Sequence, residues 1–197
     1  MSLLIESIKL HDGEFKNLFY HEQRMLRSLN MLCGVDDDFN LERFLSNIHF
    51  PPTGLFKCRI LYDDLRKEVE FIPYQQKIIN TLRIVEHDRI SYEYKYADRK
   101  SIDRLFELRR ECDDILIIKK GLVTDSSVSN IVFRKGKDWL TPWSALLKGT
   151  QRQKLIGENI IMQEEIRVED IRSFDTFKLI NAMTEFDGPE NDVKNII

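Results

Sequence analysis

The sequence has few cysteines and no long apolar run. Its three cysteines, Cys33, Cys58 and Cys112, lack the close pairing that a metal clip requires. We therefore expect reduced, structural thiols and no metal site. The N-terminal stretch has no basic segment leading into an apolar one, and no later segment approaches the length of a membrane-spanning helix. These absences predict a cytoplasmic protein.

The sequence also has little net charge. It contains 30 Lys and Arg residues against 33 Asp and Glu residues, which leaves a formal charge of -3. This balance does not favour binding to nucleic acid or to an anionic membrane. Hydrophobic residues make up 42% of the 197 residues, enough to bury a core in one domain or in two small ones. We expect a globular protein.

Local patterns in the first part of the chain predict alternating strands and helices. An Asp-Gly pair at residues 12–13 predicts a tight hairpin. Helical spacing of apolar residues predicts a helix at residues 20–34 that ends at a glycine, and a second helix at residues 37–48 that is capped by Asp or Asn. A polar segment that follows Pro73 predicts a domain boundary.

The second part of the chain, residues 74–197, is rich in β-forming residues. Residues 100–112 have a helical repeat, and strands rich in Ile and Val follow, each bounded by Gly or Pro. The polar end at residues 187–197 is expected to be frayed.

Four local features have ordinary structural explanations. Lys95 lies between two tyrosines, where its stem could cover the rings while its ammonium reaches water. Arg24 could be a surface arginine of an amphipathic helix. The polar stretch "VTDSSVSN" at residues 123–130 suits a turn, and "GTQ" at residues 149–151 suits a helix start with a capping threonine.

Taken together, the four features have the residue types that hold pyridoxal 5'-phosphate (PLP). This cofactor needs a lysine that binds it covalently, a carboxylate for its ring nitrogen, and donors for its phosphate. A lysine among aromatic rings also fits, because desolvation lowers the pKa of a lysine and favours its neutral, reactive form.

The four motifs, in this order, resemble those of the class IV aminotransferase family, the fold type IV PLP enzymes. "HEQR" is similar to the family's H-x-x-R motif with its phosphate arginine, here Arg24. "YKYADR" matches the Schiff-base lysine, here Lys95. "VTDSSVSN" matches the strand turn that ends in Asn130, with Asp125 where the family usually has glutamate. "GTQR" matches the phosphate turn at Gly149.

This resemblance implies a fold and a set of site residues. The fold would be α+β, with a small α/β N-terminal domain (residues 1–73) that carries the phosphate arginine, and a larger barrel-like C-terminal domain (residues 74–197) that carries Lys95. The partners would be a small-molecule amino substrate and a second copy of the chain in a homodimer. The residues that would contact the cofactor are Arg24, Asp125, Asn130, Gly149, Thr150, Gln151, Asn181, Ala182 and Met183.

The stretch "INAMTEF" at residues 180–186 is similar to that of one family member, aminodeoxychorismate lyase. The resemblance therefore favours elimination of pyruvate from 4-amino-4-deoxychorismate to give 4-aminobenzoate, with Lys95 as the proton carrier. A branched-chain or D-amino acid aminotransferase would use the same residues. A non-catalytic module that keeps the PLP pocket is a further alternative.

Overall fold

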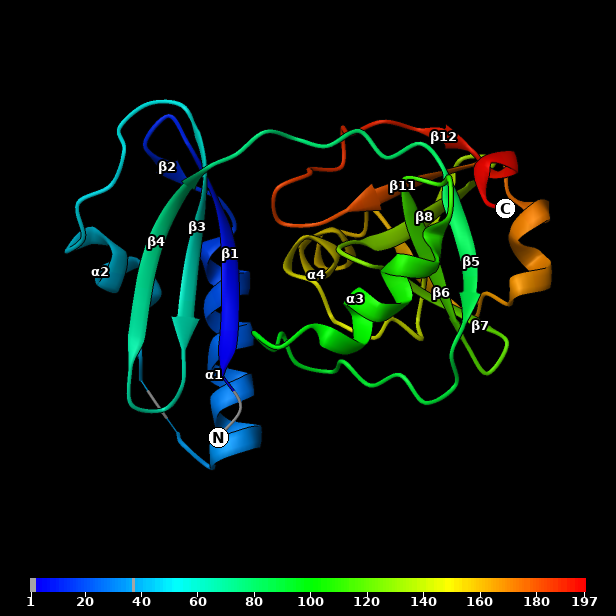
Figure 1. Ribbon diagram of the computed structural model, residues 1–197. Helices are drawn as coiled ribbons and strands as arrows, with labels where there is room; N and C mark the ends of the chain where they lie inside the picture. The colour runs from blue at the N-terminus through cyan, green and yellow to red at the C-terminus, as the bar shows by residue number, and fades with distance from the viewer. Residues whose placement is uncertain (1–2, 37) are drawn as a thin grey trace. The chain divides into compact units, whose positions relative to one another are not determined.

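The computed structural model describes residues 3–36 and 38–197, and its chain forms two compact units (Figure 1). The first unit contains the chain up to Gln76 together with Tyr94–Asp98. The second contains Lys77–Glu93 and Arg99–Ile197. Asp37, one of the predicted caps of the second helix, lies outside the described residues.

The first unit is built on an antiparallel sheet in the order β2-β1-β3-β4. Its strands are β1 (Leu4–His11), β2 (Glu14–Phe15), β3 (Leu55–Tyr62) and β4 (Lys67–Pro73). The predicted hairpin joins β1 to β2, and both turn residues, Asp12 and Gly13, have positive φ angles of 48° and 80°. A two-residue turn of this kind matches the twist of the paired strands.

Two helices follow the hairpin. Helix α1 (Leu18–Cys33) runs alongside β1 in Figure 1 and ends at Gly34, whose φ of 68° suits a left-handed C-terminal cap. Helix α2 (Leu41–Ser46) is capped by Asn40, whose side chain accepts a hydrogen bond from Arg43 N. The buried apolar core of this unit lies between α1 and the sheet, and it includes Leu4, Ile8, Met25, Leu29, Leu41, Leu45, Cys58, Ile60 and Tyr62.

The segment Tyr94–Asp98, which the sequence assigned to the second domain, clusters with the first unit. Its backbone pairs with the edge of β1, because Lys95 O accepts a hydrogen bond from Ile5 N (2.9 Å) and Ala97 N donates one to Leu3 O (2.8 Å). Tyr94 and Tyr96 also pack against the core of this unit. The long-range pairing with β1 therefore determines where the Lys95 segment lies.

The second unit contains a larger sheet in the order β10-β9-β8-β7-β6-β5, in which β11 also pairs with β8, and β12 pairs with β11. Its strands are β5 (Leu82–Glu86), β6 (Asp114–Lys119), β7 (Leu122–Ser126), β8 (Asn130–Lys135), β9 (Asp138–Pro142), β10 (Met162–Glu164), β11 (Thr176–Ile180) and β12 (Asn191–Asp192). The pairs β5/β6 and β9/β10 are parallel, whereas the other pairs are antiparallel. Strand β8 pairs with β7, β9 and β11, which makes it the centre of the sheet.

Helices α3 (Lys100–Phe106) and α4 (Thr150–Gly157) belong to the second unit, as do the short 3-10 turns η1 (Glu107–Arg109), η2 (Val168–Ser173) and η3 (Val193–Asn195). The mixture of helices and mainly antiparallel strands confirms the α+β prediction. In the described part of the chain, no helix has both the length and the apolar character needed to cross a membrane.

The prediction of a frayed C-terminus is wrong. Ile196 is fully buried in the core of the second unit, and Ile197 N donates a hydrogen bond to Leu82 O (2.8 Å). Ile197 O accepts one from Ile84 N in return, so the last residues lie beside β5, as Figure 1 shows. The polar residues of this segment led to the wrong prediction. Val193 and Ile196 lie among them but are buried in the core, and their burial holds the C-terminus in place.

Candidate active site

Lys95 lies in the irregular segment that pairs with β1 in the first unit. Its side chain is partly buried. Tyr94 and Tyr96, the residues before and after Lys95, contact each other edge to face, with ring centroids 6.0 Å apart. The pairing with β1 places Lys95 in the same unit as the buried His21. Burial lowers the pKa of His21, and the charges of Arg24 and Lys95 lower it to a smaller extent. Residues 74 positions apart in the chain are therefore within electrostatic range.

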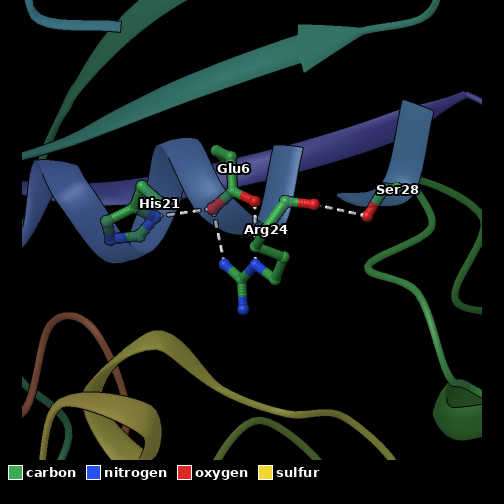
Figure 2. Close-up of polar contacts among 4 residues, drawn as sticks. All are labelled: Glu6, His21, Arg24 and Ser28. Atoms are coloured by element: carbon green, nitrogen blue, oxygen red, sulfur yellow. Dashed lines mark hydrogen bonds and ion pairs between the residues drawn. The ribbon is translucent and has the colours of Figure 1, made fainter. Parts of the chain in front are cut away.

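Arg24, on α1, is bound to a buried carboxylate, Glu6, that was not predicted from the sequence as a site residue. Figure 2 shows Glu6 of β1 facing Arg24 and His21 of α1. Arg24 donates from Nε to Glu6 Oε1 (2.8 Å) and from Nη2 to Glu6 Oε2 (2.5 Å). His21 Nδ1 approaches Glu6 Oε2 to 2.6 Å, and both of these side chains are fully buried. One carboxylate thus ties two residues of α1 to β1.

The charges in this cluster can be assigned from its contacts. Burial by itself raises the pKa of Glu6, but the charge of Arg24 and the hydrogen bonds from His21 and Arg24 outweigh burial and lower this pKa to about 2. Burial lowers the pKa of His21, which favours the neutral ring. Because Glu6 is ionised and only accepts, the proton of the neutral imidazole must be on Nδ1.

The second unit holds Asp125 and Asn130 as neighbours across the β7–β8 pair. Asn130 Nδ2 donates to Asp125 Oδ1 (2.7 Å) and to Leu147 O (2.9 Å), while Leu147 N donates to Asp125 Oδ2 (2.9 Å). Burial raises the pKa of Asp125 to about 6, although these hydrogen bonds and the charge of Arg152 act in the opposite direction. The carboxylate is therefore buried with a neighbouring loop fastened to it.

That loop leads into the predicted phosphate turn. Gly149 is the N-cap of α4, and Thr150 and Gln151 in the first turn are buried. A Cβ on Gly149 would lie 2.1 Å from Asn130 Oδ1, so only glycine fits against Asn130. Backbone N–H groups at a helix start can bind an anion, because they have no carbonyl one turn earlier. The structure thus brings Asp125, Asn130 and the helix start together.

Arg152 belongs to the matched "GTQR" motif but was not selected as a site residue. It is only 1% exposed, and it donates to Thr141 Oγ1 (3.2 Å), Pro142 O (2.8 Å) and Gln163 Oε1 (3.0 Å). All three acceptors are neutral. Burial lowers the pKa of Arg152, and the charge of Asp125 acts in the opposite direction. The charge of this buried guanidinium therefore favours the ionised form of Asp125, which lies in the same unit.

Asn181, Ala182 and Met183 form a turn after β11 in the second unit. Asn181 Oδ1 accepts hydrogen bonds from Met183 N (2.8 Å) and Thr184 N (2.9 Å), and Asn181 Nδ2 donates to Ser129 Oγ (2.8 Å). These contacts stabilise the turn and join it to the segment that precedes Asn130. Contact of these three residues with a cofactor stays a prediction.

Comparisons with known proteins show which family the chain belongs to. Residues 73–186 match the family described as Amino-transferase class IV. An uncharacterized protein of Haemophilus influenzae (strain Rd) is 42% identical over 185 residues, which cover 91% of this chain and 97% of that protein.

Two solved structures share the fold. A crystal structure from Haemophilus somnus 129pt, provisionally described as a 4-amino-4-deoxychorismate lyase, is 36% identical with a TM-score of 0.88, and the match covers 94% of this chain and 98% of that one. An aminotransferase from Brucella abortus bound to PLP is 19% identical with a TM-score of 0.72, covering 96% and 83%. The chain belongs to the class IV aminotransferase family, and the predicted fold type IV architecture is confirmed.

Proposed function

We propose that this chain is a PLP-dependent enzyme that acts as a 4-amino-4-deoxychorismate lyase, releasing pyruvate and forming 4-aminobenzoate. The observation that carries the proposal is the 36% identity, over 94% of the chain, to a structure provisionally described as this lyase. The residues of both units agree with PLP chemistry. A cytoplasmic location and a homodimer stay predictions.

The donor groups of the chain fit PLP. The first unit contributes a partly buried lysine, Lys95, and an arginine on α1, Arg24. The second unit contributes a buried carboxylate, Asp125, and a helix start at which Asn130 leaves no room for a side chain on residue 149. A carboxylate suits a protonated ring nitrogen, and arginine and helix-start N–H groups suit a phosphate.

In this proposal each group has one task. PLP, when bound, supplies an electron sink for negative charge at the substrate carbon that bears the amino group. Lys95 Nζ would hold the cofactor covalently, and the same amine would be the base that removes the proton from that carbon. Asp125 would keep a proton on the ring nitrogen, and Arg24 and the start of α4 would hold the phosphate.

Loss of that proton drives the elimination. The bond between the ring carbon and the ether oxygen breaks, and the oxygen leaves with the electron pair. Lys95 returns a proton to the departing three-carbon group, which is released as pyruvate, while the ring becomes aromatic as 4-aminobenzoate. No acceptor acid is consumed in this sequence.

An aminotransferase is the second candidate, because the family is named for that activity and the Brucella abortus protein of the same fold is an aminotransferase. The two reactions share Lys95, Asp125 and Arg24, and they differ in where the proton from the substrate goes. An aminotransferase moves the amino group onto its cofactor and needs a keto acid to complete the cycle.

The experiment is to incubate PLP-loaded protein with 4-amino-4-deoxychorismate in the absence of any keto acid, and to measure pyruvate and 4-aminobenzoate. We expect many equivalents of both products per subunit, and none from Lys95→Ala. The lyase proposal would be wrong if the protein stops after one turnover and continues only when 2-oxoglutarate is added. Activity on branched-chain or D-amino acids would then identify it as an aminotransferase.

A further inference from the structure

Glu6 is a fully buried carboxylate for which the proposed chemistry has no use. It lies on the inner face of β1, between the core residues Leu4 and Ile8. Burial of a carboxylate is unfavourable unless charged or hydrogen-bonding partners compensate for lost hydration. The partners of Glu6 therefore explain how the chain tolerates a charge at this position.

The main partner is Arg24, which Glu6 holds by a two-point fork. Donation from Nε and Nη2 to the two carboxylate oxygens fixes the plane of the guanidinium as well as its distance. Nη1 is not part of this fork, and Figure 2 shows the third guanidinium nitrogen pointing away from Glu6. Glu6, held on β1, therefore fixes the plane of the guanidinium and with it the direction in which Nη1 points.

The carboxylate is itself held from its other side. His21, one helical turn before Arg24, donates from Nδ1 to the same oxygen that Nη2 contacts. One turn after Arg24, Ser28 Oγ donates to Arg24 O (2.7 Å). The position of Glu6 is also set by the β1–β3 register, in which it pairs with Ile60. Each part of the cluster is therefore anchored to α1 or to the sheet.

We propose that Glu6 is a positioning residue that holds the guanidinium of Arg24 in the orientation needed to bind the cofactor phosphate. This inference rests on the proposed function, because it requires Arg24 to contact phosphate. The negative charge of Glu6 also weakens the attraction of Arg24 for an anion. Positioning outweighs this effect because, without the fork, a long flexible side chain must be ordered when the phosphate binds.

The test compares PLP with pyridoxal, which lacks only the phosphate. Dissociation constants of both compounds are measured by absorbance titration of cofactor-free protein. The ratio of the two constants isolates the phosphate contribution, because a general loss of folding or of the lysine adduct weakens both compounds alike. Glu70→Gln, the same chemical change in an exposed ion pair on β4, is the control.

We expect Arg24→Ala to weaken PLP binding about ten- to hundredfold, and Glu6→Gln to weaken it about three- to tenfold, with pyridoxal binding unchanged in both. Glu70→Gln should leave the ratio at its wild-type value. The double variant should resemble Arg24→Ala alone, because Glu6 acts through Arg24. If Glu6→Gln does not fold, Glu6→Asp keeps the charge on a shorter arm and should lower the same preference for PLP.

The remaining outcomes separate the two proposals. If Arg24→Ala lowers the preference for PLP but the Glu6 variants do not, Glu6 has no positioning role and the phosphate assignment of Arg24 stands. A preference that rises in Glu6→Gln would mean that the charge of Glu6 opposes phosphate binding, which also overturns the inference. If Arg24→Ala leaves the preference for PLP over pyridoxal unchanged, Arg24 does not bind the phosphate. The phosphate role of Arg24 and the positioning role of Glu6 are then both wrong.

Discussion

Replacing Gly149 with alanine tests the packing of the second unit without any cofactor. The backbone of Gly149 has φ -63° and ψ 146°, a conformation that alanine adopts without strain. The obstacle is the side chain of Asn130, whose Oδ1 lies 2.1 Å and whose Cγ lies 3.3 Å from the position of the new Cβ. Either Asn130 or the 147–149 loop must therefore move.

The cost of that movement follows from the hydrogen bonds of Asn130. Its Nδ2 donates to the Asp125 carboxylate (2.7 Å) and to Leu147 O (2.9 Å). A buried hydrogen bond contributes about 0.5 to 1.5 kcal/mol, and one to a charged group about 1.5 to 3 kcal/mol. Losing both predicts that Gly149→Ala lowers the free energy of unfolding by about 2 to 4.5 kcal/mol.

The assay is urea unfolding at pH 7 of the cofactor-free wild type, Gly149→Ala, Asn130→Ala and the double variant. Asn130→Ala removes the obstacle along with the hydrogen bonds. In the Asn130→Ala protein, two opposing effects of Gly149→Ala remain. Alanine lowers the entropy of the unfolded chain, which stabilises the fold, but it is a poorer N-cap than glycine. Gly149→Ala should therefore lower the free energy of unfolding of this protein by less than about 1 kcal/mol.

The comparison between the two backgrounds decides the result. A cost of Gly149→Ala that is equal with and without Asn130 would show that the contact between these residues is not the cause. An unchanged unfolding free energy in the wild-type background would refute the steric argument directly. A large cost that disappears with Asn130 confirms it, since residues in contact give non-additive effects.

Two further predictions concern the first unit. Borohydride reduction of the PLP-loaded protein followed by peptide mapping should find the cofactor on Lys95, and attachment to another lysine would contradict the assignment. The pKa of Glu6 is lowered from 4.5 to about 2, so its ionisation stabilises the fold above pH 4.5 and this contribution, about 3 kcal/mol, is lost as the pH falls toward 2. Between pH 5 and pH 3 the unfolding free energy of the wild type should therefore fall by about 2 kcal/mol more than that of Glu6→Gln in urea titrations, and equal falls would contradict the ion-pair account.

Features that depend on neighbours in the chain could be predicted from the sequence. The Asp12-Gly13 turn and the helix stop at Gly34 follow from backbone preferences of single residues, and both are present. The α+β class follows from the alternation of helical and strand periods. Asp125 and Asn130 are five residues apart on adjoining strands, so the short turn between them accounts for their contact.

Features that depend on distant segments required the tertiary structure. Glu6 reads as a polar residue in a strand, and its contact with Arg24 spans 18 positions. The burial of Glu6 could have been predicted, because residues 4, 6 and 8 share one face of the strand and the apolar Leu4 and Ile8 place that face toward the core. A buried carboxylate needs a partner, but the sequence does not show which residue that partner is.

The same reason explains the segment of Lys95 and the C-terminus. Each pairs with a strand far away in the chain, Lys95 O with Ile5 N of β1 and Ile197 with Leu82 of β5. Local sequence specifies which residues can form a strand or a turn, because those preferences act over a few bonds. Which buried groups meet depends on strand register and helix packing, and these are decided only when the whole chain buries its apolar surface.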